Sequence, residues 1–107
     1  MFDYIYYNRR KIIFNNQLYV TLGVDNNVPI ELQFFMWETI RDLSEPRYYL
    51  QIFEFDMEND VQTVIHKQED PTYTQIYKFK GISKNIKTKV YVIDDETYSR
   101  MLLASEY

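Results

Sequence analysis

The chain has 107 residues and a formal net charge of −4, and 46% of its residues are hydrophobic while 26% are charged. These proportions are typical of globular proteins and exclude a disordered chain or a coiled coil. The chain contains no cysteine, which excludes disulfides, thiolate metal sites and a cysteine nucleophile. A length close to that of one average domain predicts a single domain over residues 1–107, with residues 1–17 as an N-terminal arm or hairpin.

The first half of the chain predicts an arm, a strand and a long helix. Short apolar stretches at residues 2–7 and 12–14 form the arm or hairpin, and a strand follows over residues 18–22. Asp25–Asn27 is typical of a turn, and a helix is predicted from Pro29 to Ser44, because proline is tolerated in the first helical turn.

The predicted helix has a wide apolar face. Glu31, Glu38 and Asp42 fall on one narrow polar stripe, whereas the apolar residues spread over half the circumference or more. Phe34 and Phe35 lie on opposite shoulders of the apolar arc. We therefore expect one of these two phenylalanines to be partly exposed and available to a partner.

The second half of the chain predicts four strands and a short helix. Aromatic residues make up 18% of the chain, and such residues favour pleated strands. The predicted strands are 47–55, 61–67, 73–79 and 86–93. Asp94 and Asp95 are candidate caps of a short final helix, in which Tyr98, Met101 and Leu102 have helical spacing. The predicted fold class is α+β, a mostly antiparallel twisted sheet of about five strands packed by one long helix and a short C-terminal helix.

The sequence offers little support for catalysis or metal binding. Acidic residues alternate over residues 54–60 as in a calcium loop, but Val61 and Lys67 stand where that loop requires glycine and glutamate. His66 is the only histidine, and no motif for a nucleophile, a phosphate loop or a zinc protease is present. We predict a protein that is not an enzyme, with no catalytic residue, no cofactor and no metal. An enzyme that uses His66 as a general base beside Glu69 remains an alternative.

Two basic clusters give a second alternative, a nucleic-acid-binding module. Tyrosines would stack on bases, and cations would contact phosphates. The residues in question are Tyr4, Tyr6, Tyr7, Arg9 and Arg10 in the arm, and Lys78, Lys80, Lys84, Lys87 and Lys89. An isoelectric point near 4.9 opposes this interpretation, and lysines that solvate strand faces or protect a sheet edge explain the second cluster equally well.

The acidic residues give a third alternative, an inhibitor that imitates the phosphates of DNA. Its surface would combine the helix stripe with residues 54–60 and 94–96. A net charge of −4 is modest for such a function.

Neither a membrane span nor a signal peptide is predicted. No apolar run approaches the roughly 18 residues of a membrane helix, and residues 1–20 lack the apolar segment of a signal peptide. We therefore expect a cytoplasmic protein without a membrane partner.

Several segments in a fixed order resemble a small family of unknown function from staphylococci and other Gram-positive bacteria. The resemblance covers residues 18–107 and leaves residues 1–17 as an extra arm. The matching segments are Tyr19–Thr21 with Gly23, Pro29–Trp37, Tyr49–Glu54, Ile65–Pro71, Val92–Asp95 and Met101–Tyr107. The resemblance implies a cytoplasmic bacterial protein, encoded on a phage or another mobile element, and it implies no activity, cofactor or catalytic residue.

These observations together predict a small protein-binding protein, an adaptor or an inhibitor. It would dock another protein through open sheet edges or through the aromatic shoulder of the helix, and the same edges offer a route to a homo-oligomer. The candidate binding residues are Phe34, Phe35 and Trp37, together with the polar residues Glu31, Gln33, His66, Gln68 and Glu69. If the helix crosses the sheet, these polar residues meet at one site; alternatively, Glu31 and Glu69 serve the helix dipole and a turn.

Overall fold

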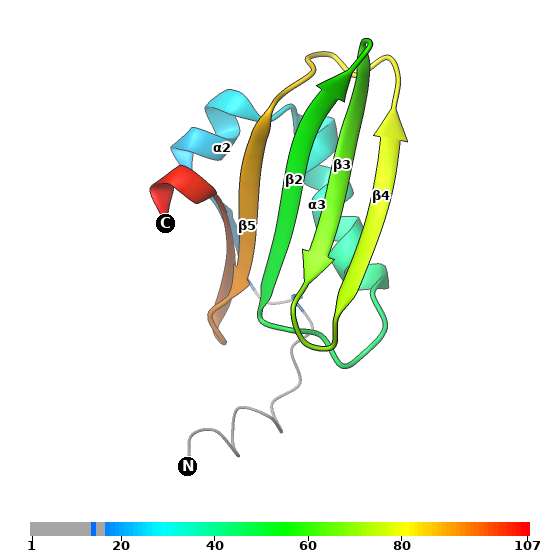
Figure 1. Cartoon of the computed structure of the whole chain (residues 1–107). Coiled ribbons are helices and arrows are strands. Elements are labelled where there is room, and N and C mark those ends of the chain that lie inside the picture. The colour runs from blue at the N-terminus through cyan, green and yellow to red at the C-terminus, as the bar shows by residue number, and fades with distance from the viewer. Residues whose placement is uncertain (1–13, 15–16) are drawn as a thin grey trace.

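The computed structural model describes residue 14 and residues 17–107. The described residues form six strands and two α-helices, and a 3₁₀ turn, η1, follows the last strand; Figure 1 shows their arrangement. The elements in chain order are β1 (Gln17–Val20), α2 (Leu22–Asn27), α3 (Ile30–Asp42), β2 (Leu50–Glu58), β3 (Val61–Gln68), β4 (Tyr73–Phe79), β5 (Thr88–Asp94), β6 (Tyr98–Leu103) and η1 (Ala104–Glu106).

All six strands belong to one mixed sheet with the order β1-β6-β5-β2-β3-β4. Strands β2, β3 and β4 form an antiparallel meander, and β5 pairs with the other side of β2. Strand β6 is antiparallel to β5, whereas β1 is parallel to β6. Strands β1 and β4 are therefore the two edges of the sheet.

The predicted fold class is wrong in two respects. The structure is mostly β, with a six-stranded mixed sheet in place of about five antiparallel strands. Residues 98–103 form strand β6 in place of a C-terminal helix, and only the 3₁₀ turn η1 follows. Met101 pairs with Val92 and Leu102 with Tyr91, so Met101 and Leu102 face opposite sides of the sheet. Both are buried, which gives a short apolar run whose period does not distinguish strand from helix.

The helix predicted from Pro29 to Ser44 is observed as α3. Asp25–Asn27, predicted as a turn, lies in the short helix α2, whose N-cap is Thr21. The Thr21 hydroxyl accepts a hydrogen bond from the Val24 N–H at 3.2 Å, which is the ordinary role of an N-cap threonine.

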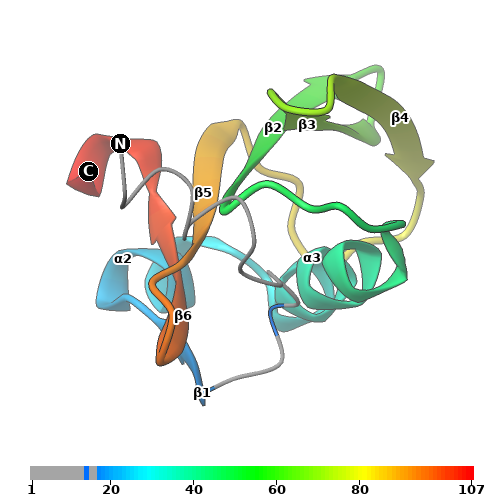
Figure 2. The ribbon, with the colours of Figure 1, turned by 90° about the horizontal axis from the view of Figure 1, so that it is seen from below.

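Figure 2 shows α3 on the concave side of the sheet, and α2 lies beside β6. The core fills the space between α3 and the sheet, because alternate residues of the central strands point toward α3. Its fully buried apolar side chains are Phe14, Val24, Leu32, Met36, Ile40, Phe53, Val64, Val90, Val92 and Met101.

A fully buried glutamine, Gln62, holds the connection between β4 and β5 against β3. Its Oε1 atom accepts a hydrogen bond from the Ile86 N–H at 2.6 Å, and its Nε2 atom donates to the Ile86 carbonyl at 3.0 Å. The same Nε2 atom also donates to the Asp56 carbonyl at 2.8 Å. The Gln62 side chain thus bonds to backbone groups of both β2, at Asp56, and the β4–β5 connection, at Ile86.

Glu106 in η1 joins the end of β6 to the start of α2. Its carboxylate accepts hydrogen bonds from the Thr21 hydroxyl at 2.7 Å and from the Leu103 N–H at 2.8 Å. The carboxylate lies so close to Gly23 that a Cβ atom there would be 2.5 Å from Oε2. Glycine is therefore the residue that permits this contact.

Candidate functional site

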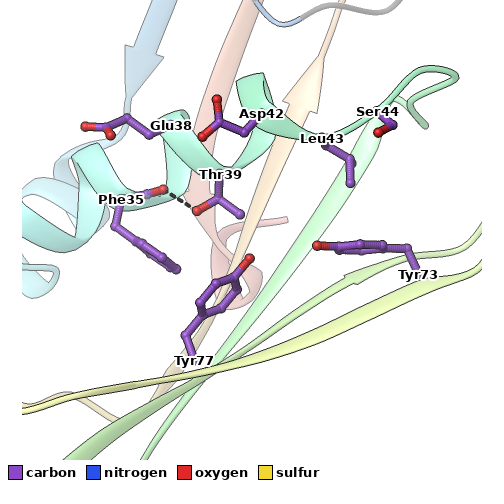
Figure 3. Close-up of a pocket in the computed structure, with 8 residues that line it drawn as sticks. All are labelled: Phe35, Glu38, Thr39, Asp42, Leu43, Ser44, Tyr73 and Tyr77. Atoms are coloured by element: carbon purple, nitrogen blue, oxygen red, sulfur yellow. Dashed lines mark hydrogen bonds between the residues drawn. The ribbon is translucent and has the colours of Figure 1, made fainter.

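An open groove of about 450 Å³ lies between the C-terminal half of α3 and the edge strand β4 (Figure 3). One wall is α3 with the residues that follow it, and the other wall is β4. Eight residues line the groove: Phe35, Glu38, Thr39, Asp42, Leu43, Ser44, Tyr73 and Tyr77.

An aromatic cluster attaches α3 to β4 at the base of the groove. Tyr77 pairs with the buried Val64 in the sheet register, so its ring faces α3. The ring of Phe35 meets Tyr77 and Phe79 edge-on, at centroid distances of 4.9 Å and 4.8 Å. Tyr73 lies on the same face of β4, four residues before Tyr77, and completes the wall.

The groove is polar and acidic at its rim. Glu38 and Asp42 are both exposed and lie one helical turn apart on α3. Figure 3 shows the hydroxyl groups of Tyr73 and Tyr77 directed toward each other. The Thr39 hydroxyl donates to the Phe35 carbonyl at 2.7 Å, so its proton stays within the helix.

Burial raises the pKa of Tyr77 to about 12, and the hydrogen bond with Tyr73 and the nearby charges of Tyr73 and Asp42 act in the same direction. Tyr77 therefore stays protonated at neutral pH. The groove then presents the neutral hydroxyl group of Tyr77 together with the side chains of Tyr73, Glu38 and Asp42.

The β4 edge beside this groove is long and regular. The β3–β4 register runs without a bulge from Gln62↔Phe79 to Gln68↔Tyr73. The strand contains neither glycine nor proline, its one lysine is Lys78, and Ile76 is 57% exposed. Among the described residues no strand pairs with its outer side. Natural proteins usually block such an edge with prolines, bulges or several charges.

The predicted aromatic shoulder divides into an exposed and a packed residue. Phe34 is 59% exposed. Phe35 packs against Phe53, Tyr77 and Phe79, and Trp37 is buried in the core. Phe34 is the phenylalanine that remains available at the surface, and Phe35 is a structural residue.

His66 and Gln68 belong to a buried polar network. The His66 Nε2 atom lies 2.6 Å from Gln51 Oε1, and Gln51 Nε2 donates to Gln68 Oε1 at 2.8 Å. Gln68 Oε1 also accepts the Tyr48 N–H at 2.8 Å. The His66 ring stacks on Phe53 at a centroid distance of 4.3 Å, and burial lowers its pKa to about 4. This network ties β2, β3 and the residues before β2 together.

The other predicted polar residues contact different parts of the molecule. The Glu31 carboxylate accepts the Ser83 N–H at 3.0 Å, which lowers its pKa, and Gln33 donates to the Val28 carbonyl at 2.9 Å. Glu69 is exposed in the β3–β4 turn. The structure therefore does not gather the predicted polar residues at one site.

The basic residues are also dispersed. Tyr4, Tyr6, Tyr7, Arg9 and Arg10 lie outside the described residues. Lys78 and Lys89 lie on the sheet face opposite the helices, since they alternate with inward-facing neighbours. Lys80, Lys84 and Lys87 are exposed in the connection between β4 and β5.

The candidate acidic surface is divided as well. Residues 54–60 end β2 at the upper hairpin in Figure 1, whereas residues 94–96 form the β5–β6 turn at the lower end. Glu54 pairs with Lys67 at 3.1 Å, and Asp95 pairs with Arg100 at 2.8 Å.

Sequence reasoning missed Tyr73 and Tyr77 as site residues. These two tyrosines, with Gln75 and Phe79, alternate with Thr74, Ile76 and Lys78, and this alternation predicts a strand. The strand order is needed to show that β4 is an edge strand. The position of α3 behind the sheet is seen only in the folded structure (Figure 1).

Comparisons with known proteins place the chain in a family. No curated protein matches it in sequence. Its fold is similar to that of a protein of unknown function from Enterococcus faecalis, known from a crystal structure, with a TM-score of 0.74 and 21% identity over 92% of this chain and 96% of that chain. Among the described residues, no helix is long and apolar enough to cross a membrane. The family match spans residues 17–106, so the chain belongs to DUF960, a family described as a staphylococcal protein of unknown function.

Proposed function

We propose that this protein is a non-enzymatic, cytoplasmic protein-binding protein that receives an extended segment of a partner as an additional strand on β4. The observation that carries the proposal is the unbulged seven-residue edge of β4 beside the groove. An exposed edge offers a row of backbone donors and acceptors, and strand addition is a common way in which proteins bind peptides.

The side chains of an added strand would alternate between two environments. One set would enter the groove beside Tyr73 and Tyr77. The other set would lie next to Ile76, which pairs with Ile65 on the face opposite the helices. Backbone hydrogen bonds would supply affinity, and these two environments would supply specificity.

A pair of neighbouring proline variants tests the proposal. Backbone N–H groups alternate in direction along an antiparallel strand, so one of Gln75 and Ile76 donates toward β3 and the other points away from the sheet. Gln75→Pro and Ile76→Pro would therefore differ: one disrupts the β3–β4 pairing, and the other removes only an outward donor. Circular dichroism and thermal melting identify the variant that stays folded.

The binding measurement is a tagged pull-down from a Gram-positive bacterial lysate, with and without nuclease. We expect a stoichiometric protein that survives nuclease, is retained by the unaltered chain, and is lost from the folded proline variant. Equal retention by the folded proline variant would contradict the proposal. Recovery of nucleic acid in place of a protein would also contradict it, and would favour the basic clusters.

The acidic surface is tested in the same experiment. A DNA-mimicking inhibitor would retain a nucleic-acid-binding protein through carboxylates, and this capture would be unaffected by the folded proline variant. That result would contradict strand addition at β4 and would favour the DNA-mimicking inhibitor.

A further inference from the structure

We infer that the partner segment carries a lysine or arginine whose side chain occupies the groove between α3 and β4. This inference rests on strand addition at β4 and specifies the chemistry of the added strand. It follows from the position of the groove, its charge and its aromatic walls.

The position of the groove suits a side chain of an added strand. Successive side chains of a strand point to opposite faces, and neighbouring strands lie about 4.8 Å apart. Figure 3 shows Tyr77 pointing from β4 toward α3, and Tyr73 beside it with its hydroxyl directed toward Tyr77. A residue beside Tyr77 on an added strand would point the same way and would enter the groove, whose α3 wall includes Glu38 and Asp42.

The charge of the groove selects a cation. Glu38 and Asp42 lie four residues apart on one helix, and two like charges at this spacing repel each other. Within residues 17–107, neither carboxylate forms an ion pair with lysine or arginine. A cation between them would remove this repulsion, whereas an anionic side chain would add to it.

The remaining groove surface suits the rest of a basic side chain. Lysine and arginine have apolar stems, for which Phe35 and Leu43 supply apolar contacts. The rings of Tyr73 and Tyr77 offer their faces or hydroxyl oxygens to the cationic head, and cations are attracted to tyrosine rings. An uncharged side chain would gain only the apolar part of these contacts.

The opposite face of the sheet lacks this selectivity. There the Glu54 carboxylate lies 3.1 Å from the Lys67 ammonium and 3.8 Å from the Lys89 ammonium. These charges already compensate one another within the protein. The groove thus differs from the opposite face in having two carboxylates that form no ion pair with a lysine or arginine among the described residues.

The test is selection of peptides from a random displayed library on the full chain. We expect the enriched peptides to share a lysine or arginine at one fixed position. Their affinity should fall at least tenfold for the variant Glu38→Gln/Asp42→Asn, and by a similar factor when norleucine replaces the peptide lysine or citrulline replaces the arginine. The control Asp25→Asn/Glu58→Gln removes two exposed carboxylates outside the groove and should leave the affinity unchanged.

The outcomes separate this inference from strand addition itself. Enriched peptides that lack a basic residue, bind the Glu38→Gln/Asp42→Asn variant normally and fail to bind the folded β4 proline variant would overturn the inference and leave strand addition intact. No enrichment, or peptides whose affinity is unchanged in the folded proline variant, would overturn strand addition and the inference with it.

Discussion

The Nε2 atom of His66 lies 2.6 Å from the Oε1 atom of Gln51, and both side chains are fully buried. Gln51 uses its Nε2 group to donate to the Tyr48 carbonyl and to Gln68 Oε1, which leaves Gln51 Oε1 as an acceptor. The His66 proton therefore resides on Nε2. Its Nδ1 atom is buried without a hydrogen-bond partner, so a second proton there would add an unpaired charge to the core.

We predict that acid destabilises the protein through His66. Its pKa is lowered from 6.5 to about 4 in the folded state, so the unfolded state binds the proton first as the pH falls. The free energy of unfolding should be unaffected by this group above pH 6.5 and should decrease between pH 6.5 and pH 4, by roughly 3 kcal/mol in total at about 1.4 kcal/mol per pH unit.

Urea denaturation at several pH values measures this effect, and the His66→Gln variant is the reference that retains the other acidic groups. The difference between the two curves should change with pH only below 6.5. Because His66 is the only histidine, its ring resonances in an NMR titration are unambiguous. A ring that titrates near pH 6.5 in the folded protein would contradict the prediction.

Gln62 should be much more important for stability than the exposed Gln75. Gln62→Leu leaves the Ile86 N–H and C=O groups buried without this partner, and each unpaired buried group costs about 1–3 kcal/mol. We expect a loss of roughly 2–4 kcal/mol in chemical denaturation. The control Gln75→Leu should change stability by less than about 0.5 kcal/mol, and equal losses would contradict the role assigned to Gln62.

Gly23 and Glu106 should be energetically coupled. In the natural background, Gly23→Ala displaces the Glu106 carboxylate and weakens its hydrogen bonds to Thr21 and Leu103. In the Glu106→Ala background the same substitution meets no carboxylate and should stabilise α2 by about 0.5–1 kcal/mol through helix propensity. A double-mutant cycle in thermal or urea unfolding should give a coupling of about 1–2 kcal/mol, and additivity would contradict the contact.

The two adjacent phenylalanines of α3 should respond differently to truncation. Phe35→Ala removes ring contacts with Phe53, Tyr77 and Phe79 and should cost about 2–4 kcal/mol, close to the values for core phenylalanines. Phe34→Ala, at a position that is 59% exposed, should cost less than about 0.5 kcal/mol. Equal losses in urea denaturation would contradict the assignment of Phe35 to the core.

Local patterns predicted the elements whose signals are strong. The helix predicted from Pro29 to Ser44 corresponds to α3, and the strand predicted over residues 73–79 corresponds to β4. A long apolar arc ended by Pro46 and a strict alternation of aromatic residues are sufficient for these assignments. The wide arc could not decide between Phe34 and Phe35, because that choice depends on where β4 lies relative to the helix.

Long-range pairing is what the sequence could not predict. Residues 98–103 have helical spacing of apolar side chains, yet they lie between β5 and β1 in the sheet, and this placement determines their conformation. The groove depends on the same information. Tyr73 and Tyr77 line the same groove as Glu38 and Asp42 only because β4 ends the sheet and α3 packs behind it, and neither fact leaves a local signature.

The parallel pairing of β1 with β6 affects the order in which the chain can assemble. The β2–β3–β4 meander closes through neighbouring segments, whereas Thr21 and Glu106 are 85 residues apart in the chain. Contacts at such separation form late because closing a long loop carries a high entropic cost. During synthesis, β1 and α2 therefore emerge from the ribosome long before their partners β6 and η1 exist, and they stay unpaired until those partners arrive.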